Sequence, residues 1–193
     1  MEQLNLFRQG TPTTHLLGIH GPDGVGKTSL ARAAQNLDGR VRVLSVGGPI
    51  KQKAAGAVDL PPARVEQNKA VLRTLLRSVG TTARDLHGKD HWLKKLAEQY
   101  ATLPVGSIGI IDDIRTDSEA QWVKDQGGSV ITLYRKGEVP TEAEKKEMLL
   151  EDIEADLIVW NDFGRHSRQL EAIAKGILWG DSLQKAERQM SAA

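Results

Sequence analysis

The chain has 193 residues, of which 39% are hydrophobic and 26% are charged, a composition that is ordinary for a soluble globular protein. Its formal net charge is +1, so the overall charge gives no support for a nucleic-acid or membrane surface. Cysteine is absent, which excludes disulfides, thiolate metal sites and cysteine nucleophiles.

The sequence also bears on location and on the number of domains. Residues 1–10 lack the apolar core of a signal peptide. No apolar run approaches the roughly 20 residues that cross a bilayer. We therefore expect a cytoplasmic protein without a membrane partner. The length favours one domain with room for a small insertion.

Short apolar runs alternate with longer helical patterns, an order that is typical of parallel βαβ units. Five runs are predicted to be strands: 15–19, 41–46, 108–111, 130–134 and 157–160. Several are apolar nearly throughout, as expected where helices cover both faces of a sheet. The sequence therefore predicts an α/β fold in which one five-stranded parallel sheet lies between two layers of helices.

Helices are predicted between these strands, at 27–36, 65–79, 92–97 and 167–178. Thr116 and Thr141 are each followed three residues later by Glu, so they are predicted to begin two further helices with capping boxes. Residues 47–49 and 60–62 are rich in Gly and Pro, and they are predicted to be loops around a section inserted after the second strand.

A phosphate-binding motif follows the first predicted strand. Residues 21–28, Gly-Pro-Asp-Gly-Val-Gly-Lys-Thr, match G-x-x-x-x-G-K-S/T at every fixed position. They lie between an apolar run and a helical run, which is the setting that this motif requires. Glycines allow backbone N–H groups to surround phosphate oxygens, and the start of the helix adds favourable partial charge. The motif predicts that the chain binds a nucleoside triphosphate.

Roles within the motif follow from its chemistry. Lys27 is expected to place its ammonium between the β- and γ-phosphates, and the Thr28 hydroxyl is a candidate ligand for Mg²⁺. ATP and Mg²⁺ are thus the predicted cofactors. The residues predicted to contact the nucleotide are Gly21, Asp23, Gly24, Val25, Gly26, Lys27, Thr28 and Ser29.

An acidic pair supports this interpretation. The run 108–111 is followed by Asp112 and Asp113, which gives the form of a Walker-B strand that holds Mg²⁺ through water. In an open parallel sheet the end of such a strand lies beside the phosphate loop. We predict that Asp113 organises the metal, with Asp112 as the alternative.

Binding a triphosphate leaves several functions open. A GTPase switch would need an N-K-x-D motif, and the nearest match, at 68–71, lacks the Asp. A motor ATPase usually has an Asp-Glu pair and a second domain, whereas this chain has two Asp and little spare length. A small-molecule kinase fits better because it needs only the core, an acceptor site and a lid. A P-loop ATPase or regulatory nucleotide-binding protein is the alternative.

The order of several segments resembles the bacteriophage-type deoxynucleoside monophosphate kinases. The segments are 21–28, 72–81 with Arg84, 90–92, 111–120, 127–135 and 155–161. Together they extend the resemblance over roughly residues 14–178. The D-x-R-x-x-x-E-A and R-x-L-L-x-x-x-G-T segments are much more specific together than the phosphate loop, which many families share. Dephospho-coenzyme A kinases share the strand that ends in Asn161.

The resemblance implies a P-loop kinase fold and transfer of the γ-phosphoryl group of ATP to the 5′-phosphate of a (deoxy)nucleoside monophosphate. It implies one domain, 1–193, with a helical acceptor-binding insertion at about 50–103 and a lid at about 135–152. The partner would be this small molecule rather than a nucleic acid, family members are often homodimers, and a phage-encoded chain would work in the host cytoplasm. A kinase similar to the dephospho-coenzyme A kinases is the neighbouring alternative.

Cations outside the loop are candidates to bind the acceptor phosphate or the transferring group, because a guanidinium suits phosphate geometry. The predicted substrate-binding residues are Arg73, Arg77, Arg84, Trp92, Arg115 and Arg135, with core packing as the alternative role of Trp92. The predicted catalytic residues are Lys27, Asp113 and Arg115. Lys145 and Lys146 fit either the lid or a charged surface helix. The five histidines show no metal-ligand spacing and are assigned no chemistry.

Overall fold

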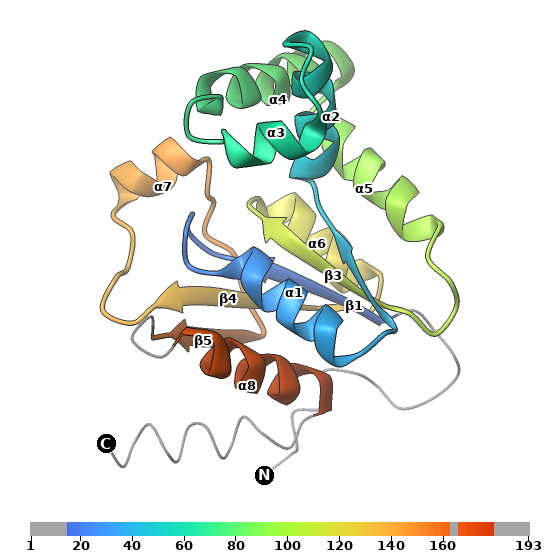
Figure 1. Ribbon diagram of the computed structural model, residues 1–193, viewed down its shortest axis with the longest axis vertical. Helices are drawn as coiled ribbons and strands as arrows, with labels where there is room; N and C mark the ends of the chain where they lie inside the picture. Colours follow the sequence, from blue (N-terminus) through green and yellow to red (C-terminus); the bar gives the residue numbers. More distant parts are fainter. Residues whose placement is uncertain (1–14, 163–165, 180–193) are drawn as a thin grey trace. The chain divides into compact units, whose positions relative to one another are not determined.

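The computed structural model describes residues 15–162 and 166–179 (Figure 1). Residues 1–10, on which the expectation about a signal peptide rests, lie outside these ranges. The chain divides into two compact units. Unit 2 is Leu44–Thr102, and unit 1 comprises the residues up to Val43 and from Leu103 onward.

Unit 1 is built on a five-stranded sheet with the strand order β2-β3-β1-β4-β5. Its strands are β1 (His15–His20), β2 (Val41–Leu44), β3 (Ile108–Ile114), β4 (Ser129–Arg135) and β5 (Leu157–Asn161). β1 lies between β3 and β4 and pairs with both in parallel, and β4 pairs with β5 in parallel. The phosphate-binding motif therefore follows the central strand, and the prediction of a five-stranded parallel sheet is confirmed.

Helices cover both faces of this sheet (Figure 1). The helices of unit 1 are α1 (Lys27–Leu37), α6 (Asp117–Asp125), α7 (Glu142–Met148) and α8 (His166–Trp179). Alternate residues of β1, Leu17 and Ile19, are fully buried in one core cluster with α1 and α8. On the other face a Cβ at Gly18 would lie 3.4 Å from Val123 of α6. Successive residues of β1 thus point to opposite faces of the sheet, and each face packs against its own apolar layer. The three-layer α/β prediction is confirmed.

Unit 2 consists of four helices: α2 (Gly47–Ala57), α3 (Pro62–Gln67), α4 (Arg73–His87) and α5 (His91–Ala101). Its core includes the fully buried Val65 and Leu96, and Trp92, which is 1% exposed. The Trp92 indole nitrogen donates to the carbonyl oxygen of Gly80 at 2.9 Å. The buried position of Trp92 therefore fits core packing, one of the two roles expected for it.

Two predictions for this part of the chain were wrong. Residues 47–49 begin α2 instead of forming a loop. Pro49 lies in the first turn, where its missing N–H costs no helical hydrogen bond, and the Ser45 hydroxyl accepts a hydrogen bond from the N–H of Gly48 at 3.1 Å. The helix predicted at 65–79 is broken after Gln67. There the side-chain amide of Asn68 donates to the carbonyl of Arg64 at 2.8 Å, which competes with continuation of the helix.

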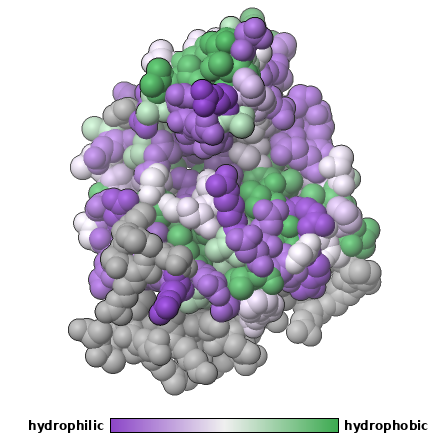
Figure 2. All heavy atoms as spheres, viewed as in Figure 1, coloured by the Kyte–Doolittle hydropathy of each residue, from purple (hydrophilic) through white to green (hydrophobic). Residues whose placement is uncertain are grey.

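The described surface is mainly polar. On the face seen in Figure 2, hydrophilic side chains predominate and interrupt the apolar areas. Large apolar side chains are strongly exposed at Val71 and Leu86 of unit 2. Among the described residues, no helix combines the length and the apolar character needed to span a bilayer.

Both predicted capping boxes are present, at Thr116 before α6 and at Thr141 before α7. The Thr116 hydroxyl accepts from the N–H of Glu119 at 3.3 Å, and the Glu119 carboxylate accepts from the N–H of Thr116 at 3.2 Å. The same carboxylate accepts from the N–H of Arg115 at 2.8 Å and is 5% exposed. The box therefore fixes the turn that leaves β3, and with it the backbone of Arg115.

Replacing Thr116 with Ala should lower the free energy of unfolding by about 1 kcal/mol, because one N–H at the start of α6 loses its partner. Thr116→Ser keeps the hydroxyl and is the control. Urea unfolding of the three proteins at neutral pH is the measurement. Equal stability of the Ala and Ser variants would show that the cap contributes nothing.

Candidate nucleotide site

The phosphate loop, residues 21–28, joins β1 to α1 and depends on its glycines. Gly21, Gly24 and Gly26 have φ angles of 136°, 82° and 103°, in the region that side-chain-bearing residues rarely adopt. A Cβ at Gly21 would overlap the carbonyl oxygen of Leu133. A Cβ at Gly26 would lie 2.9 Å from the side-chain nitrogen of Asn161. The loop backbone thus needs glycine both for its conformation and for its close packing.

The start of α1 is open to an anion. Its N-cap is Gly26, which has no side chain to satisfy the first N–H groups, and the first turn holds no acidic residue. Thr28 and Ser29 are exposed in this turn. The N–H groups at the start of a helix and the positive end of its dipole together favour a bound phosphate.

Lys27 is folded into the loop. Its ammonium donates to the carbonyl oxygens of Gly21 at 2.5 Å and of Pro22 at 2.7 Å, and the residue is 7% exposed. These bonds hold the positive charge beside the first half of the loop. An ammonium at this position can attract a phosphate oxygen, because a bond between a cation and an anion is stronger than one to a neutral carbonyl.

Asn161, at the end of β5, holds the loop from the other side. It is 2% exposed, and its side-chain nitrogen donates to the carbonyl oxygen of Val25 at 2.9 Å. Sequence reasoning gave it no role, although it ends the segment 155–161 in which the resemblance was seen. Because the two residues are 136 positions apart, only the folded sheet brings them together.

The two carboxylates lie within β3 instead of after it, because the strand continues to Ile114. The β1–β3 register shifts here, since Ile111 pairs with Gly18 and Ile114 pairs with His20. Asp112 and Asp113 therefore both lie opposite Ile19, as in a β-bulge. Asp112 is 7% exposed and Asp113 is half-buried.

These donors fit a magnesium ion held mainly by phosphates. The described residues contain no cluster of three or more His, Asp or Glu side chains that could hold a metal alone. Mg²⁺ needs no such cage when phosphates and water supply most of its oxygen ligands. The exposed Thr28 hydroxyl and the carboxylates of Asp112 and Asp113 offer the remaining oxygen donors.

Two predicted cations contact the loop. Arg115 donates through Nη2 to the Asp23 carboxylate and through Nη1 to the Met148 carbonyl, at 2.7 and 2.6 Å. Arg135 lies at the end of β4, where its Nη2 is 3.5 Å from the carbonyl oxygen of Gly24. The fold of unit 1 therefore brings Lys27, Arg115 and Arg135 to the same loop.

The other predicted substrate residues belong to unit 2. Arg73, Arg77 and Arg84 lie on α4, and their spacing of four and seven residues places them on one side of the helix. Arg73 is exposed, whereas Arg77 and Arg84 are half-buried. Their role in binding an acceptor stays a prediction.

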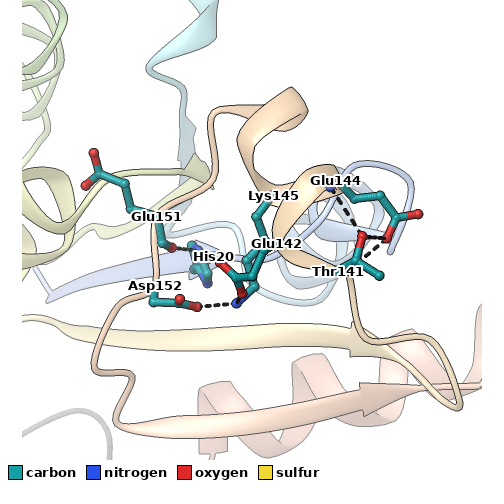
Figure 3. A network of polar contacts seen from close by, with 7 residues as sticks. All are labelled: His20, Thr141, Glu142, Glu144, Lys145, Glu151 and Asp152. Atoms are coloured by element: carbon teal, nitrogen blue, oxygen red, sulfur yellow. Dashed lines mark hydrogen bonds and ion pairs between the residues drawn. The ribbon is translucent and has the colours of Figure 1, made fainter.

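The predicted lid, 135–152, contains α7, and Figure 3 shows polar contacts within this segment and one to His20 of β1. The Lys145 ammonium bridges Asp152 and Glu142, at 2.7 Å from each, and these carboxylates raise the pKa of Lys145 above its usual range. Lys146 is exposed. Of the two lysines, Lys145 thus ties α7 to the chain that leaves it, and Lys146 fits the charged surface.

His20 is the second residue that sequence reasoning missed, and it directly precedes the loop. Its Nε2 is 3.1 Å from the carbonyl oxygen of Glu151 (Figure 3). Its Nδ1 is 3.1 Å from the Thr132 hydroxyl. A carbonyl only accepts, so Nε2 carries the proton and Nδ1 accepts from the hydroxyl. Burial lowers the pKa of His20 to about 4, and the charges of Lys27 and Arg115 act in the same direction. The ring is therefore neutral at pH 7.

This depressed pKa makes stability depend on pH. The contribution of His20 is fully present above its ordinary pKa of 6.5 and is lost as the pH falls toward about 4, because the unfolded chain takes up the proton first. At about 1.4 kcal/mol per pKa unit, the loss between pH 7.5 and 4.5 should be about 2–3 kcal/mol.

The variant His20→Gln, which cannot titrate in this range, should lose this part of the pH dependence. Urea unfolding at the two pH values, for the wild type and the variant, measures the difference. If both proteins lose the same free energy of unfolding, His20 does not carry this effect.

Comparison with known proteins adds evidence for the fold. No protein-family model matches the chain, and no curated protein matches it significantly. Among solved structures, a candidate kinase from Chloroflexus aurantiacus aligns with a TM-score of 0.50 and 16% identity, covering 95% of this chain and 99% of that one. The chain thus shares the fold of a protein assigned as a kinase over nearly its whole length.

Two further structures are more distant. A gluconokinase from Sinorhizobium meliloti has 14% identity and a TM-score of 0.47, covering 92% of this chain and 97% of its own. A sugar kinase from Janibacter sp. has 19% identity and a TM-score of 0.46, covering 86% and 95%. None of the three is described as a nucleoside monophosphate kinase. The five-stranded parallel sheet with helices on both faces, and the phosphate loop on its central strand, give this chain a P-loop kinase fold.

Proposed function

We propose that this protein is an ATP-dependent kinase that transfers the γ-phosphoryl group to the 5′-phosphate of a (deoxy)nucleoside monophosphate, giving the diphosphate. The observation that carries the kinase part is the grouping of Lys27, Arg115 and Arg135 at one phosphate loop. One lysine is enough to hold the phosphates of ATP, whereas additional guanidiniums suit a transferring group or a second phosphate.

The residues of the loop bind and orient ATP. Backbone N–H groups of the loop and of the first turn of α1 donate to the phosphate oxygens, and Lys27 lies against the β- and γ-phosphates. Asn161 and the glycines keep the loop backbone in place before the ligand arrives. Such preorganisation lowers the reorganisation needed in the transition state.

Thr28, Asp112 and Asp113 would hold Mg²⁺, with Asp113 as the residue that organises it. When bound, the ion supplies charge neutralisation on the β- and γ-phosphates. Asp113 is half-buried, so its carboxylate can reach a water ligand of the ion. Asp112 is buried, with 7% of its surface exposed, and is less accessible to water.

The acceptor needs little activation. The second pKa of a phosphate monoester is about 6, so its attacking oxygen is mostly ionised at neutral pH. No strong base is then required, and alignment of the two phosphates does most of the work. Arg115 in unit 1 is proposed to bind the transferring group or the acceptor phosphate. Arg73, Arg77 and Arg84 of α4 stay candidates for the acceptor phosphate that rest on the sequence resemblance alone. The lid, 135–152, would exclude water that could otherwise hydrolyse ATP.

The nucleotide acceptor rests on the sequence resemblance, and the kinase neighbours support only a small-molecule kinase fold. A coupled assay of ADP release from MgATP tests the acceptor. Release should be slow with ATP alone and should rise by about 10²-fold or more with the correct (deoxy)nucleoside monophosphate, because acceptor binding aligns the phosphates and closes the lid.

Two controls sharpen this assay. Lys27→Ala should reduce the stimulated rate by about 10³-fold or more, since the transferring group loses its main cationic partner. Lys175→Ala removes a half-buried lysine on α8 that pairs with Glu171, and it should leave the rate unchanged. Stimulation by dephospho-coenzyme A alone would replace the nucleotide acceptor. Fast hydrolysis without any acceptor would favour the ATPase alternative.

The carboxylates give a separate prediction. Asp113→Asn should raise the Mg²⁺ concentration needed for half-maximal activity, and it should lower kcat more than Asp112→Asn does. Magnesium titration of both variants, with circular dichroism to confirm folding, is the measurement. The opposite order would assign the metal to Asp112.

A further inference from the structure

Arg115 is already held by an anion of its own chain. Its Nη2 lies 2.7 Å from Oδ1 of Asp23, the third residue of the phosphate loop. Asp23 is the only acidic residue among residues 21–28, and it stands where a bound nucleotide places several negative charges. A carboxylate at this position would repel phosphates unless a cation neutralises it.

Met148, the last residue of α7, contacts both Arg115 and Asp23. Nη1 of Arg115 donates to the Met148 carbonyl at 2.6 Å, and the backbone N–H of Asp23 donates to the Met148 sulfur at 3.3 Å. The N–H of Glu151 donates to the carbonyl of Arg115 at 2.8 Å. Between these anchors Leu149 has a φ of 53°, a left-handed conformation that costs a leucine energy. Arg115 thus connects the phosphate loop with the end of the lid helix.

We propose that Asp23 acts as an internal competitor of the nucleotide: the terminal phosphates of ATP displace its carboxylate from Nη2 of Arg115. Arg115 keeps the Met148 carbonyl on Nη1 and thereby links the bound triphosphate to α7. Asp23 makes affinity depend on the number of phosphates, since only a ligand that reaches Arg115 can displace it. This inference rests on nucleotide binding by the loop, but it does not need the proposed acceptor.

The exchange is favourable because the two anions differ in strength. The side chains of Arg115 and Asp23 are 27% and 33% exposed, so solvent screens their attraction and the pair is weak. A phosphate group has more charge and can accept two parallel hydrogen bonds from one guanidinium. The carboxylate is therefore strong enough to hold Arg115 in the free protein and weak enough to be replaced.

The test is a binding experiment without acceptor. Isothermal titration measures the Kd of MgATP and of MgADP for the wild type and for Asp23→Asn, which keeps size and polarity but removes the charge. Asp23→Asn should tighten MgATP binding about three- to fivefold, the range set by a screened ion pair. The Kd of MgADP, which lacks the γ-phosphate, should stay the same.

A double-mutant cycle separates competition from simple repulsion. In the Arg115→Ala background, Asp23→Asn should change the ratio of the MgATP and MgADP affinities less than it does beside Arg115, because no ion pair is left to release and only repulsion is relieved. Asp38→Asn breaks a comparable ion pair with Arg40, away from the loop, and should change neither affinity. Circular dichroism confirms that each variant is folded.

The outcomes are distinct. The proposal is overturned if Asp23→Asn leaves MgATP binding unchanged, or if the gain persists at full size in the Arg115→Ala background, which would mean general repulsion. A gain that is clearly smaller in proteins without Arg115 supports it. Binding that follows this pattern in a protein that no mononucleotide stimulates would sink the proposed acceptor and leave the competition intact.

Discussion

The site depends on the backbone of one loop being held in conformations that only glycine adopts easily. Gly21, Gly24 and Gly26 turn the chain between β1 and α1, and Lys27 and Asn161 then bond to its carbonyl oxygens from two sides. Carbonyls that are satisfied from outside leave the N–H groups available to a phosphate. The loop is thus shaped before any ligand is present, which is what electrostatic preorganisation requires.

Sheet topology explains why these partners are close. β1 lies at the centre of the order β2-β3-β1-β4-β5, and it pairs in parallel with both β3 and β4. The carboxyl ends of neighbouring strands therefore gather at the edge where the loop begins, as in other open parallel sheets. Asp112 and Asp113 come from β3, Arg135 from β4 and Asn161 from β5.

The charges at this edge form a coupled set. Lys27 and Arg115 help to keep His20 neutral, and neutral His20 accepts from Thr132 while it donates to the chain that returns from α7. Arg115 joins Asp23 to that same returning chain. The phosphate loop and the segment at the end of α7 are therefore joined by one or two hydrogen bonds through these side chains.

The sequence by itself determined the features that depend on neighbours along the chain. These are the phosphate motif, the alternation of strands and helices, and the capping boxes at Thr116 and Thr141, whose partners are three residues away. Only the tertiary structure decided the strand order and the bulge that places both Asp112 and Asp113 opposite Ile19. It also decided the hydrogen bonds of His20, Asn161 and Arg115. Asp23 and Arg115 are 92 positions apart, and His20 and Glu151 are 131 apart. No local pattern encodes such pairs, since side chains this far apart meet only after the sheet has assembled.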